Sequence, residues 1–190
     1  QLKKSGGSVL AFVTTDNVKV GAKGAEYIIG KLPEGGEVAI IEGKSGNASG
    51  EFRRQGATEA FKADSKFKLV ASQPADWDRS KALDVAANLI QKYPNLKAIY
   101  ACNDTMALGA VQAVANAGKT GQILVVGTDG APEARTSIDE GKLNATVAQD
   151  PAMIGATSLK ILIEAIKDKP QISPDIEAKE VPVESNLISK

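Results

Sequence analysis

The chain has 190 residues, a length that suits one good-sized domain or a domain with part of another. Its 23 Lys and Arg residues balance 23 Asp and Glu residues, so no net charge favours nucleic acid or a strongly charged partner. The hydrophobic share of 43% excludes a disordered chain, and no apolar run approaches the ~20 residues of a transmembrane helix. The absence of His and the single Cys exclude Cys/His zinc sites, His-dependent triads and an intrachain disulfide.

Short apolar runs alternate with amphipathic stretches along the whole chain. The apolar runs that predict strands are 8–14, 37–42, 67–71, 97–101, 122–127 and 144–148. Apolar residues at helical spacing predict helices between them, at 20–28, 49–63, 83–90, 106–117, 132–140 and 151–167. Pro151 suits the first turn of the last of these helices.

This alternation predicts an α/β fold, because strands that are separated by helices pair in parallel. Continuous apolar strands fit a doubly wound parallel sheet with helices on both faces. The tail at 178–188 is predicted to be one last strand, at an edge of the sheet because Pro182 has no N–H to donate.

The candidate site residues lie after the strands, because ligands of open α/β sheets bind beyond the carboxyl ends of the strands. Planar polar side chains dominate these segments, together with the only Trp of the chain. In chain order they are Thr15, Asp16, Asn17, Arg53, Trp77, Asn103, Asp104, Asp129, Gln149 and Asp150. Such a set suits a polyol: carboxylate, amide and guanidinium groups hold neighbouring hydroxyls, and an indole lies against the apolar face of a sugar ring.

Several of these residues also have a purely structural interpretation. Trp77 could equally anchor the core or a lid, since buried Trp is common. Asp76 and Asp78 are interpreted as caps of the next helix. Asp104 is interpreted as the cap of the helix after that one, which leaves Asn103 freer to face a ligand.

Other candidates have structural alternatives of a different kind. Asp129 fits a turn before Gly130 as well as it fits a ligand contact. Arg53 and Arg54 are adjacent on a helix and point in different directions, so at least one is expected to be an ordinary solvated arginine. Cys102 has no His to activate it and is expected to be a small buried residue.

Motifs for other chemistries fail on spacing. The Gly-Lys-Ser at 43–45 lacks the first glycine of a P-loop, because Val38 stands at that position. The segment 76–87 opens like a calcium loop but has Lys81 and Ala87 where Gly and Glu are needed. No carboxylate pair is singled out for acid catalysis. The sequence therefore predicts no catalytic residues, no metal and no cofactor.

Six segments together resemble the ribose-binding cluster of bacterial periplasmic sugar-binding proteins. They are DNVKVGAKGAEYI, IIEGKSGNASGEFRRQGATEAF, LVASQPADWDRSKALDV, AIYACNDTMALGA, VVGTDGAPEA and ATVAQDPAMIGA. The resemblance covers nearly the whole chain. It implies a monosaccharide ligand, D-allose in first place and D-ribose or a related sugar next, a periplasmic location, and no enzyme activity.

The resemblance also implies which residues bind the sugar. They are Arg53 of R-x-x-G, the stacking Trp77 of ADWDR, Asn103 of N-D-x-M-A-L-G, Asp129 of G-x-D-G, and Gln149 of A-T-x-A-Q. All five fall on strand ends that the topology had already indicated. The partners that the resemblance implies are the permease of an inner-membrane ABC transporter and a chemoreceptor, with no nucleic acid.

Proteins of this family have two similar lobes joined by three crossovers, with the sugar between the lobes. The resemblance divides the chain into a crossover and lead-in (1–15), a C-terminal-type sugar-binding lobe (16–149), a helix like one of the N-terminal lobe (150–177) and a terminal strand or crossover segment (178–190). The hinge residues that it implies are Thr15, Asp16, Gln149 and Asp150. Because the helix 151–167 has two apolar faces, we expect a fragment whose missing N-terminal lobe, or a second copy, covers this helix.

Two other functions stay open at this stage. The effector domain of a sugar-responsive transcription repressor shares the fold but would need a helix-turn-helix ahead of Gln1. A sugar-acting α/β enzyme would need a catalytic pair, which the sequence does not single out. A purely structural domain would leave the polar strand ends unexplained.

Overall fold

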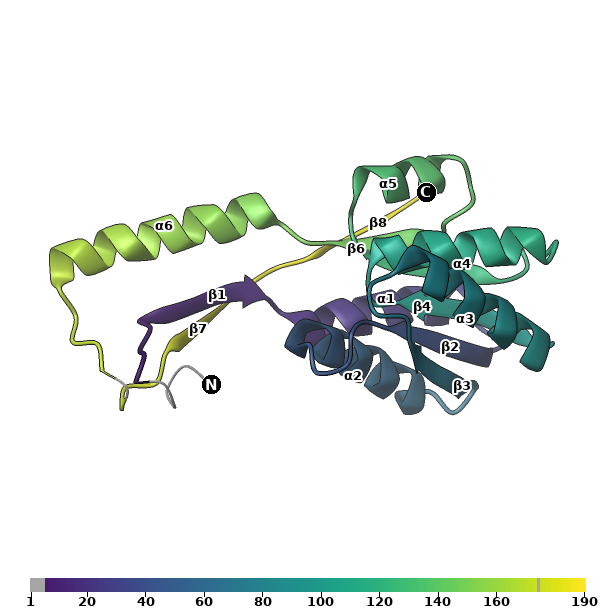
Figure 1. The fold of residues 1–190 in the computed structure, drawn as a ribbon, viewed down its shortest axis with the longest axis horizontal. Coiled ribbons are helices and arrows are strands. Elements are labelled where there is room, and N and C mark those ends of the chain that lie inside the picture. The colour runs from purple at the N-terminus through teal and green to yellow at the C-terminus, as the bar shows by residue number, and fades with distance from the viewer. Residues whose placement is uncertain (1–5, 174) are drawn as a thin grey trace. The chain divides into compact units, whose positions relative to one another are not determined.

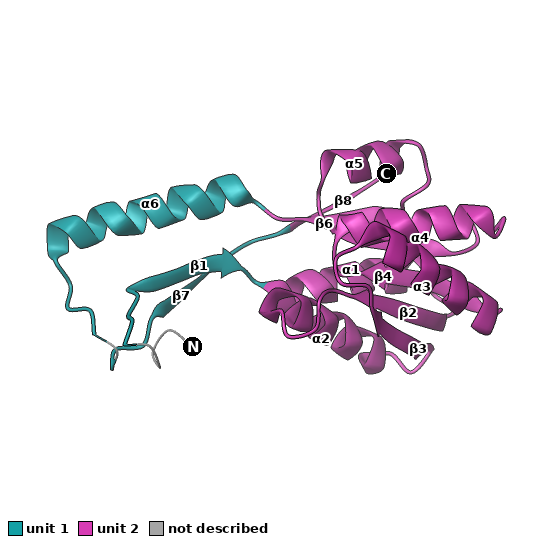
Figure 2. Cartoon of the chain, viewed as in Figure 1, with its two compact units in different colours: residues 1–16, 150–185 teal, residues 17–149, 186–190 magenta. Residues whose placement is uncertain are grey.

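The computed structural model describes residues 6–173 and 175–190. The contacts within the chain divide it into two compact units (Figure 2). Unit 1 comprises Gln1–Asp16 and Asp150–Ser185, and unit 2 comprises Asn17–Gln149 and Asn186–Lys190. The chain therefore changes unit after Asp16, after Gln149 and after Ser185.

Unit 2 is built on a six-stranded sheet in the order β3-β2-β4-β5-β6-β8 (Figure 1). Its parallel strands are β2 (Gly36–Glu42), β3 (Phe67–Pro74), β4 (Leu96–Ala101), β5 (Leu124–Asp129) and β6 (Ala145–Ala148). At one edge β8 (Asn186–Ser189) pairs antiparallel with β6. Parallel strands end at the same edge of a sheet, so β2 to β6 bring their carboxyl ends together.

The helices of unit 2 flank this sheet. They are α1 (Asn17–Lys31), α2 (Ala48–Ala63), α3 (Arg79–Lys92), α4 (Asp104–Asn116) and the short α5 (Pro132–Asp139). Helix α1 packs on α2, and α3 packs on α4. At Gly21 and Gly56 a Cβ atom would overlap the main chain of the facing helix, so these two glycines allow α1 and α2 to touch backbone to backbone.

The core of unit 2 explains why its strands are continuous apolar runs. Val38, Ala39, Ile40 and Ile41 in β2 are all fully buried, although successive side chains of a strand point to opposite faces. Helices must therefore cover both faces, as the sequence predicted. The predicted doubly wound α/β fold is confirmed.

In its described residues, unit 1 has a two-stranded sheet and one helix. Strand β1 (Ala11–Thr15) pairs in parallel with β7 (Lys179–Val183), and α6 runs from Pro151 to Asp168. Asp150 caps α6, because its Oδ1 accepts the backbone N–H of Met153 at 2.8 Å. In α6, all of which the structure describes, no residue is buried.

The structure corrects three details of the sequence prediction. The first strand lies at Ala11–Thr15 rather than 8–14. The tail forms two strands, β7 in unit 1 and β8 in unit 2, rather than one strand over 178–188. The second of these runs antiparallel, which the alternation of strands and helices gave no reason to expect. Pro182 lies in β7, and each strand of a two-stranded sheet is an edge strand.

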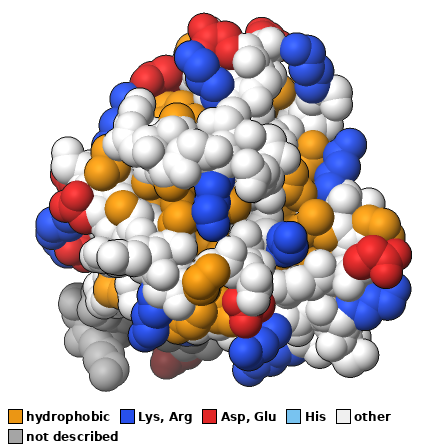
Figure 3. All heavy atoms as spheres, turned by 90° about the vertical axis from the view of Figure 1, so that its right-hand side faces the viewer, with side chains coloured by type: hydrophobic (Ala, Val, Ile, Leu, Met, Phe, Trp, Pro, Cys, Tyr) orange, Lys and Arg blue, Asp and Glu red, His pale blue; other side chains and the backbone are white. Residues whose placement is uncertain are grey.

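The surface agrees with the balanced composition. Figure 3 shows positive, negative and hydrophobic side chains interspersed over one face of the molecule. Such a face has no single-sign patch of the kind that attracts a nucleic acid backbone. In residues 6–173 and 175–190, no helix combines the length and apolar character needed to cross a membrane.

Candidate ligand-binding site

Arg53 is a buried arginine near the start of α2, at the edge of the unit 2 sheet where the parallel strands end. It is 6% exposed. Its Nε donates to Asn17 Oδ1 at 2.9 Å, and its Nη1 donates to the carbonyl oxygen of Cys102 at 2.8 Å. Burial of a charge is costly unless the charge is paired and hydrogen-bonded. These partners therefore hold the guanidinium in one orientation.

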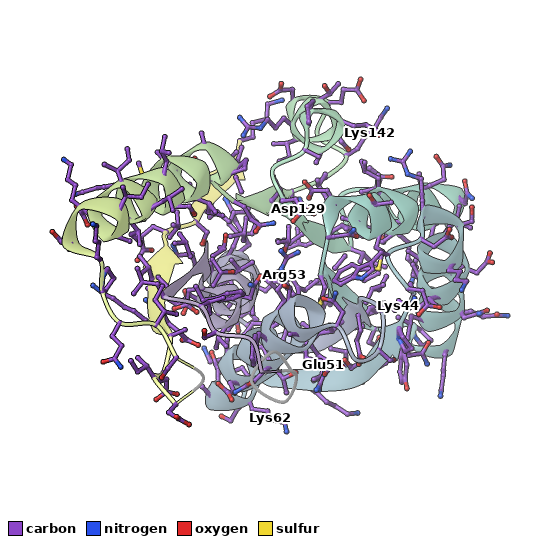
Figure 4. The ribbon with its side chains drawn as sticks, turned by 60° about the vertical axis from the view of Figure 1, so that its left-hand side comes forward. Lys44, Glu51, Arg53, Lys62, Asp129 and Lys142 are labelled. Atoms are coloured by element: carbon purple, nitrogen blue, oxygen red, sulfur yellow. The ribbon has the colours of Figure 1, made fainter. Side chains whose placement is uncertain are left out.

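The carboxylate that pairs with Arg53 is Asp129, the last residue of β5 (Figure 4). Its Oδ1 accepts from Arg53 Nη1 at 3.1 Å and from Gln149 Nε2 at 2.7 Å. Burial raises the pKa of Asp129 above its ordinary value, and the Arg53 charge opposes that rise. The structure thus brings together three of the five predicted binding residues. Asp129 lies 76 positions from Arg53 and 20 positions from Gln149 in the sequence.

This cluster keeps hydrogen-bonding capacity for a ligand. The contacts of Arg53 use Nε and Nη1, so the two N–H groups of Nη2 can still donate. Both contacts of Asp129 go to Oδ1, and its side chain is 36% exposed, so the carboxylate can accept further hydroxyls. Donors beside acceptors at one partly open sheet edge are what the neighbouring hydroxyls of a polyol require.

The structure reverses the capping prediction for Asn103 and Asp104, and the predicted ligand contact of Asn103 stays a prediction. Asn103 caps α4, because its Oδ1 accepts the backbone N–H of Met106 at 2.9 Å. Asp104 is the first residue of α4 and turns inward, where it is 2% exposed. Both residue types make good caps, so adjacent positions gave no basis for choosing between them. The Nδ2 group of Asn103 is a donor that the cap does not use.

The Trp77 loop joins β3 to α3 through an unusual backbone. Asp76 and Trp77 have φ values of 54° and 65°, the left-handed region that costs a non-glycine residue ~1–2 kcal/mol. Asp78 caps α3 through the N–H of Lys81 at 2.8 Å, as predicted, and Lys81 Nζ donates to Asp76 Oδ2 at 2.8 Å.

The indole of Trp77 lies against two glycines. A Cβ atom at Gly43 would overlap its six-membered ring, and one at Gly50 would lie 2.9 Å from Cζ2. Trp77 is half-buried and packs on the core of unit 2. The packing interpretation of this residue is therefore confirmed, and its stacking on a ligand stays a prediction.

Two further predictions concern neighbours of the site. Arg54 is the solvated arginine of the pair: its Nη2 donates to Glu51 Oε2 at 2.9 Å, and its side chain is 37% exposed. Cys102 is fully buried, and burial raises the pKa of its thiol to about 12, so it is no nucleophile at neutral pH. Across residues 6–173 and 175–190, no group of three or more acidic or Cys residues could hold a metal ion.

Asn17 is the site residue that the candidate set of five leaves out. It is 8% exposed, and its contact with Arg53 spans 36 positions. The sequence places Asn17 at a strand end, but the direction of the Arg53 guanidinium depends on how α1 and α2 pack. Its position at a strand end was the one feature of the sequence that could have identified Asn17 as a site residue.

Comparison with known proteins settles the family. The sequence profile described as "Periplasmic binding protein domain" matches residues 3–170. The chain belongs to this family. The D-allose-binding periplasmic protein of Escherichia coli K12 is 66% identical over all 190 residues. A ribose import binding protein of Salmonella typhimurium is 39% identical over 184 residues, 97% of the chain. The chain spans 61% and 60% of the lengths of these relatives.

Solved structures of solute-binding proteins agree with this membership. One from Actinobacillus succinogenes 130z, with bound D-allose, has a TM-score of 0.85 and 35% identity. The match covers 94% of this chain and 62% of that one. Another from Bacillus halodurans C-125, with bound myo-inositol, has a TM-score of 0.82 and 28% identity over 95% of this chain and 61% of that one. Both bound molecules are polyols, the ligand class that the strand ends suggested.

Proposed function

We propose that this periplasmic binding protein chain binds a monosaccharide where the parallel strands of unit 2 end. Its role is that of the solute-binding component of an ABC sugar transporter in the periplasm. The observation that carries the proposal is the buried Arg53 guanidinium, which is fixed by Asn17 and Cys102 and paired with Asp129. A cation so costly to bury, with two N–H groups to spare, fits a site whose donors are arranged before the ligand arrives.

Each residue of the site has a role that follows from the chemistry of its side chain. Arg53 donates to ring or hydroxyl oxygens, and Asp129 accepts from neighbouring hydroxyls. Asn103 donates through Nδ2. Gln149 holds Asp129 in place at 2.7 Å and lines the same edge. Trp77 stacks its indole on the apolar face of the sugar ring. These roles are all binding roles, and none transforms the sugar.

The sugar we propose is D-allose first, and D-ribose or a related sugar next. The support is the 66% identity to a D-allose-binding protein and the D-allose bound in one structural neighbour. Relatives named for ribose import are less similar, at 36% to 44% identity. Titration with D-allose, D-ribose and D-glucose discriminates between these ligands.

We propose Thr15, Asp16, Gln149 and Asp150 as hinge residues of a closing motion. The support is the position of the unit boundaries, which fall after Asp16 and after Gln149. Binding can favour a closed form only through greater affinity for that form. The closed form is what a permease, and a chemoreceptor, would recognise.

The apolar residues of α6 need a cover in the working protein. Leu159, Leu162 and Ile166 are 57%, 56% and 66% exposed. Burying a side chain of this size stabilises by ~1.5–3 kcal/mol. We propose that an N-terminal lobe, as in the family, covers them. Light scattering tests this: we expect the chain to self-associate and the two-lobed form, in which the N-terminal segment of the E. coli relative precedes this chain, to be monomeric. Self-association of both forms would point to a second copy instead.

The binding proposal is tested by comparing two adjacent arginines. In the two-lobed form, Arg53→Ala removes charge-assisted hydrogen bonds worth ~1.5–3 kcal/mol, so we expect a roughly ten- to hundredfold rise in the Kd for D-allose by calorimetry. Arg54→Ala is the matched control, because Arg54 pairs with Glu51 on the surface. It should leave the Kd unchanged within about twofold. Equal effects of both variants, or none, would contradict the proposed site.

A further inference from the structure

Asp104 joins three segments of unit 2 behind the proposed site. Its Oδ1 accepts the hydroxyl of Thr146, in β6, at 2.7 Å. Its Oδ2 accepts the backbone N–H of Ala131, in the loop after β5, at 2.7 Å. The hydroxyl oxygen of Thr146 accepts in turn the N–H of Gly130 at 3.2 Å. Asp104 therefore holds the Ala131 N–H directly, and it holds the Gly130 N–H both through Thr146 and through its own contact with that amide.

Strand β5 is shaped to admit this carboxylate. A Cβ atom at Gly127 would overlap Asp104 Oδ1, so any larger residue would push the carboxylate off its partners. Among the buried side chains of the described residues, Asp104 is the one carboxylate. A buried ionisable group is costly, which argues for a role beyond filling space.

The two N–H groups belong to a turn that needs support. Asp129 has a φ of 121°, a backbone conformation that L residues rarely adopt, and Gly130 continues the turn with a φ of 74°. Strained conformations of this kind persist only where the surroundings hold them. The contacts made by Thr146 and Asp104 are to the two residues that directly follow Asp129.

We propose that Asp104 is a positioning residue of the sugar site. It holds the 129–131 turn so that the carboxylate of Asp129 faces Arg53 and Gln149. Asp104 does not touch the sugar and acts through Asp129. The effect on sugar affinity rests on the proposed function, whereas the effect on the turn does not.

The effect on the turn is measured without any sugar, by amide hydrogen exchange of the 190-residue chain. Asp104→Ala removes the acceptor of the Ala131 N–H, so we expect that amide to exchange at least about tenfold faster. If this variant does not fold, Thr146→Val removes the acceptor of the Gly130 N–H, and Thr146→Ser restores it. Exchange within about twofold of wild type at the affected amide would overturn the proposal.

A matched control separates positioning from general loss of stability. Asn144 Oδ1 accepts the N–H of Val125, at the opposite end of β5, at 2.8 Å. Asn144→Ala should speed exchange at Val125 and leave Ala131 as it was. Faster exchange at Ala131 in this control too would mean that the strand loosens as a whole, which would contradict a local role for Asp104.

A double-mutant cycle in the two-lobed form tests the effect on binding. We expect Asp104→Asn, which keeps one acceptor oxygen, to raise the Kd for D-allose roughly tenfold. In an Asp129→Ala background the same change should alter the Kd by less than about twofold, because the residue through which it acts is gone. Multiplicative effects would overturn the proposal. A wild-type protein that binds no sugar would overturn the proposed function, while hydrogen exchange would still decide the role of Asp104.

Discussion

Units 1 and 2 contain the same kinds of elements and differ in what those elements bury. Leu89 in α3 of unit 2 is 1% exposed, whereas Leu159 in α6 of unit 1 is 57% exposed. Both helices are apolar on at least one face and both are capped by an Asp. The helical pattern and its caps are thus local properties of the sequence, whereas the stability of a helix comes mainly from what it packs against.

The sharpest test of this difference is the same substitution in both helices. Leu89→Ala should lower the free energy of unfolding of unit 2 by ~2–5 kcal/mol, because it removes a fully buried side chain and leaves a cavity. Leu159→Ala should change it by less than ~0.5 kcal/mol at a protein concentration where light scattering shows a monomer. Urea unfolding followed by the fluorescence of Trp77, which lies in unit 2, measures both. Similar losses in the two variants would mean that α6 is packed in solution.

A pair of glycines tests the comparison through the backbone. A Cβ atom at Gly21 would overlap the main chain of α2 at Arg53. A Cβ atom at Gly155 in α6 would have no described atom within 4 Å apart from its own stretch of helix backbone. Gly21→Ala should destabilise unit 2 by ~1–3 kcal/mol through overpacking. Gly155→Ala should strengthen α6 by up to ~1 kcal/mol, since Ala is the better helix former. The Trp77 transition reports the first effect, and hydrogen exchange in α6 reports the second. A destabilising Gly155→Ala would reveal a close neighbour of α6.

The smallest predicted effect is a pH dependence confined to unit 2. Burial raises the pKa of Asp104 to about 6, so the native state holds this proton more tightly than the unfolded state does. The resulting stability is present at low pH and is lost as the pH rises through 6. Between pH 7 and pH 5 the free energy of unfolding should therefore rise by ~1 kcal/mol from this group. Asp129, whose pKa is also raised, acts in the same direction.

Comparison with Asp104→Asn isolates this contribution, because the variant cannot take up the proton and keeps the other titrating groups. We expect urea unfolding at pH 5 and pH 7 to show a smaller pH dependence in the variant than in the wild type. An identical dependence in both proteins would show that Asp104 does not titrate in this range.

The strand ends and the fold class could be predicted because both depend on local pattern. Within the predicted strand at 37–42, residues 38–41 are all apolar, as the centre of a strand covered on both faces must be. Arg53, Asp129 and Gln149 were predicted to share one edge because parallel strands end together, and their hydrogen bonds join them there. Their position at one edge of the sheet does not show that they bind a sugar. The affinity measurements test that role.

The details that the sequence did not predict depend on contacts between distant segments. Asn103 and Asp104 are both good caps, and the choice is decided by Thr146 and Ala131, which give Asp104 partners inside unit 2. The tail was predicted as one strand, because nothing local shows that the chain changes unit after Ser185.

Sugar binding where the parallel strands of unit 2 end is tested by the fluorescence of Trp77. Its fluorescence in the two-lobed form is titrated with D-allose, D-ribose and D-glucose, with Trp77→Phe to subtract any other emission. We expect a saturable change with D-allose that Arg53→Ala weakens and Arg54→Ala retains. A folded protein whose Trp77 emission responds to none of these sugars would contradict it.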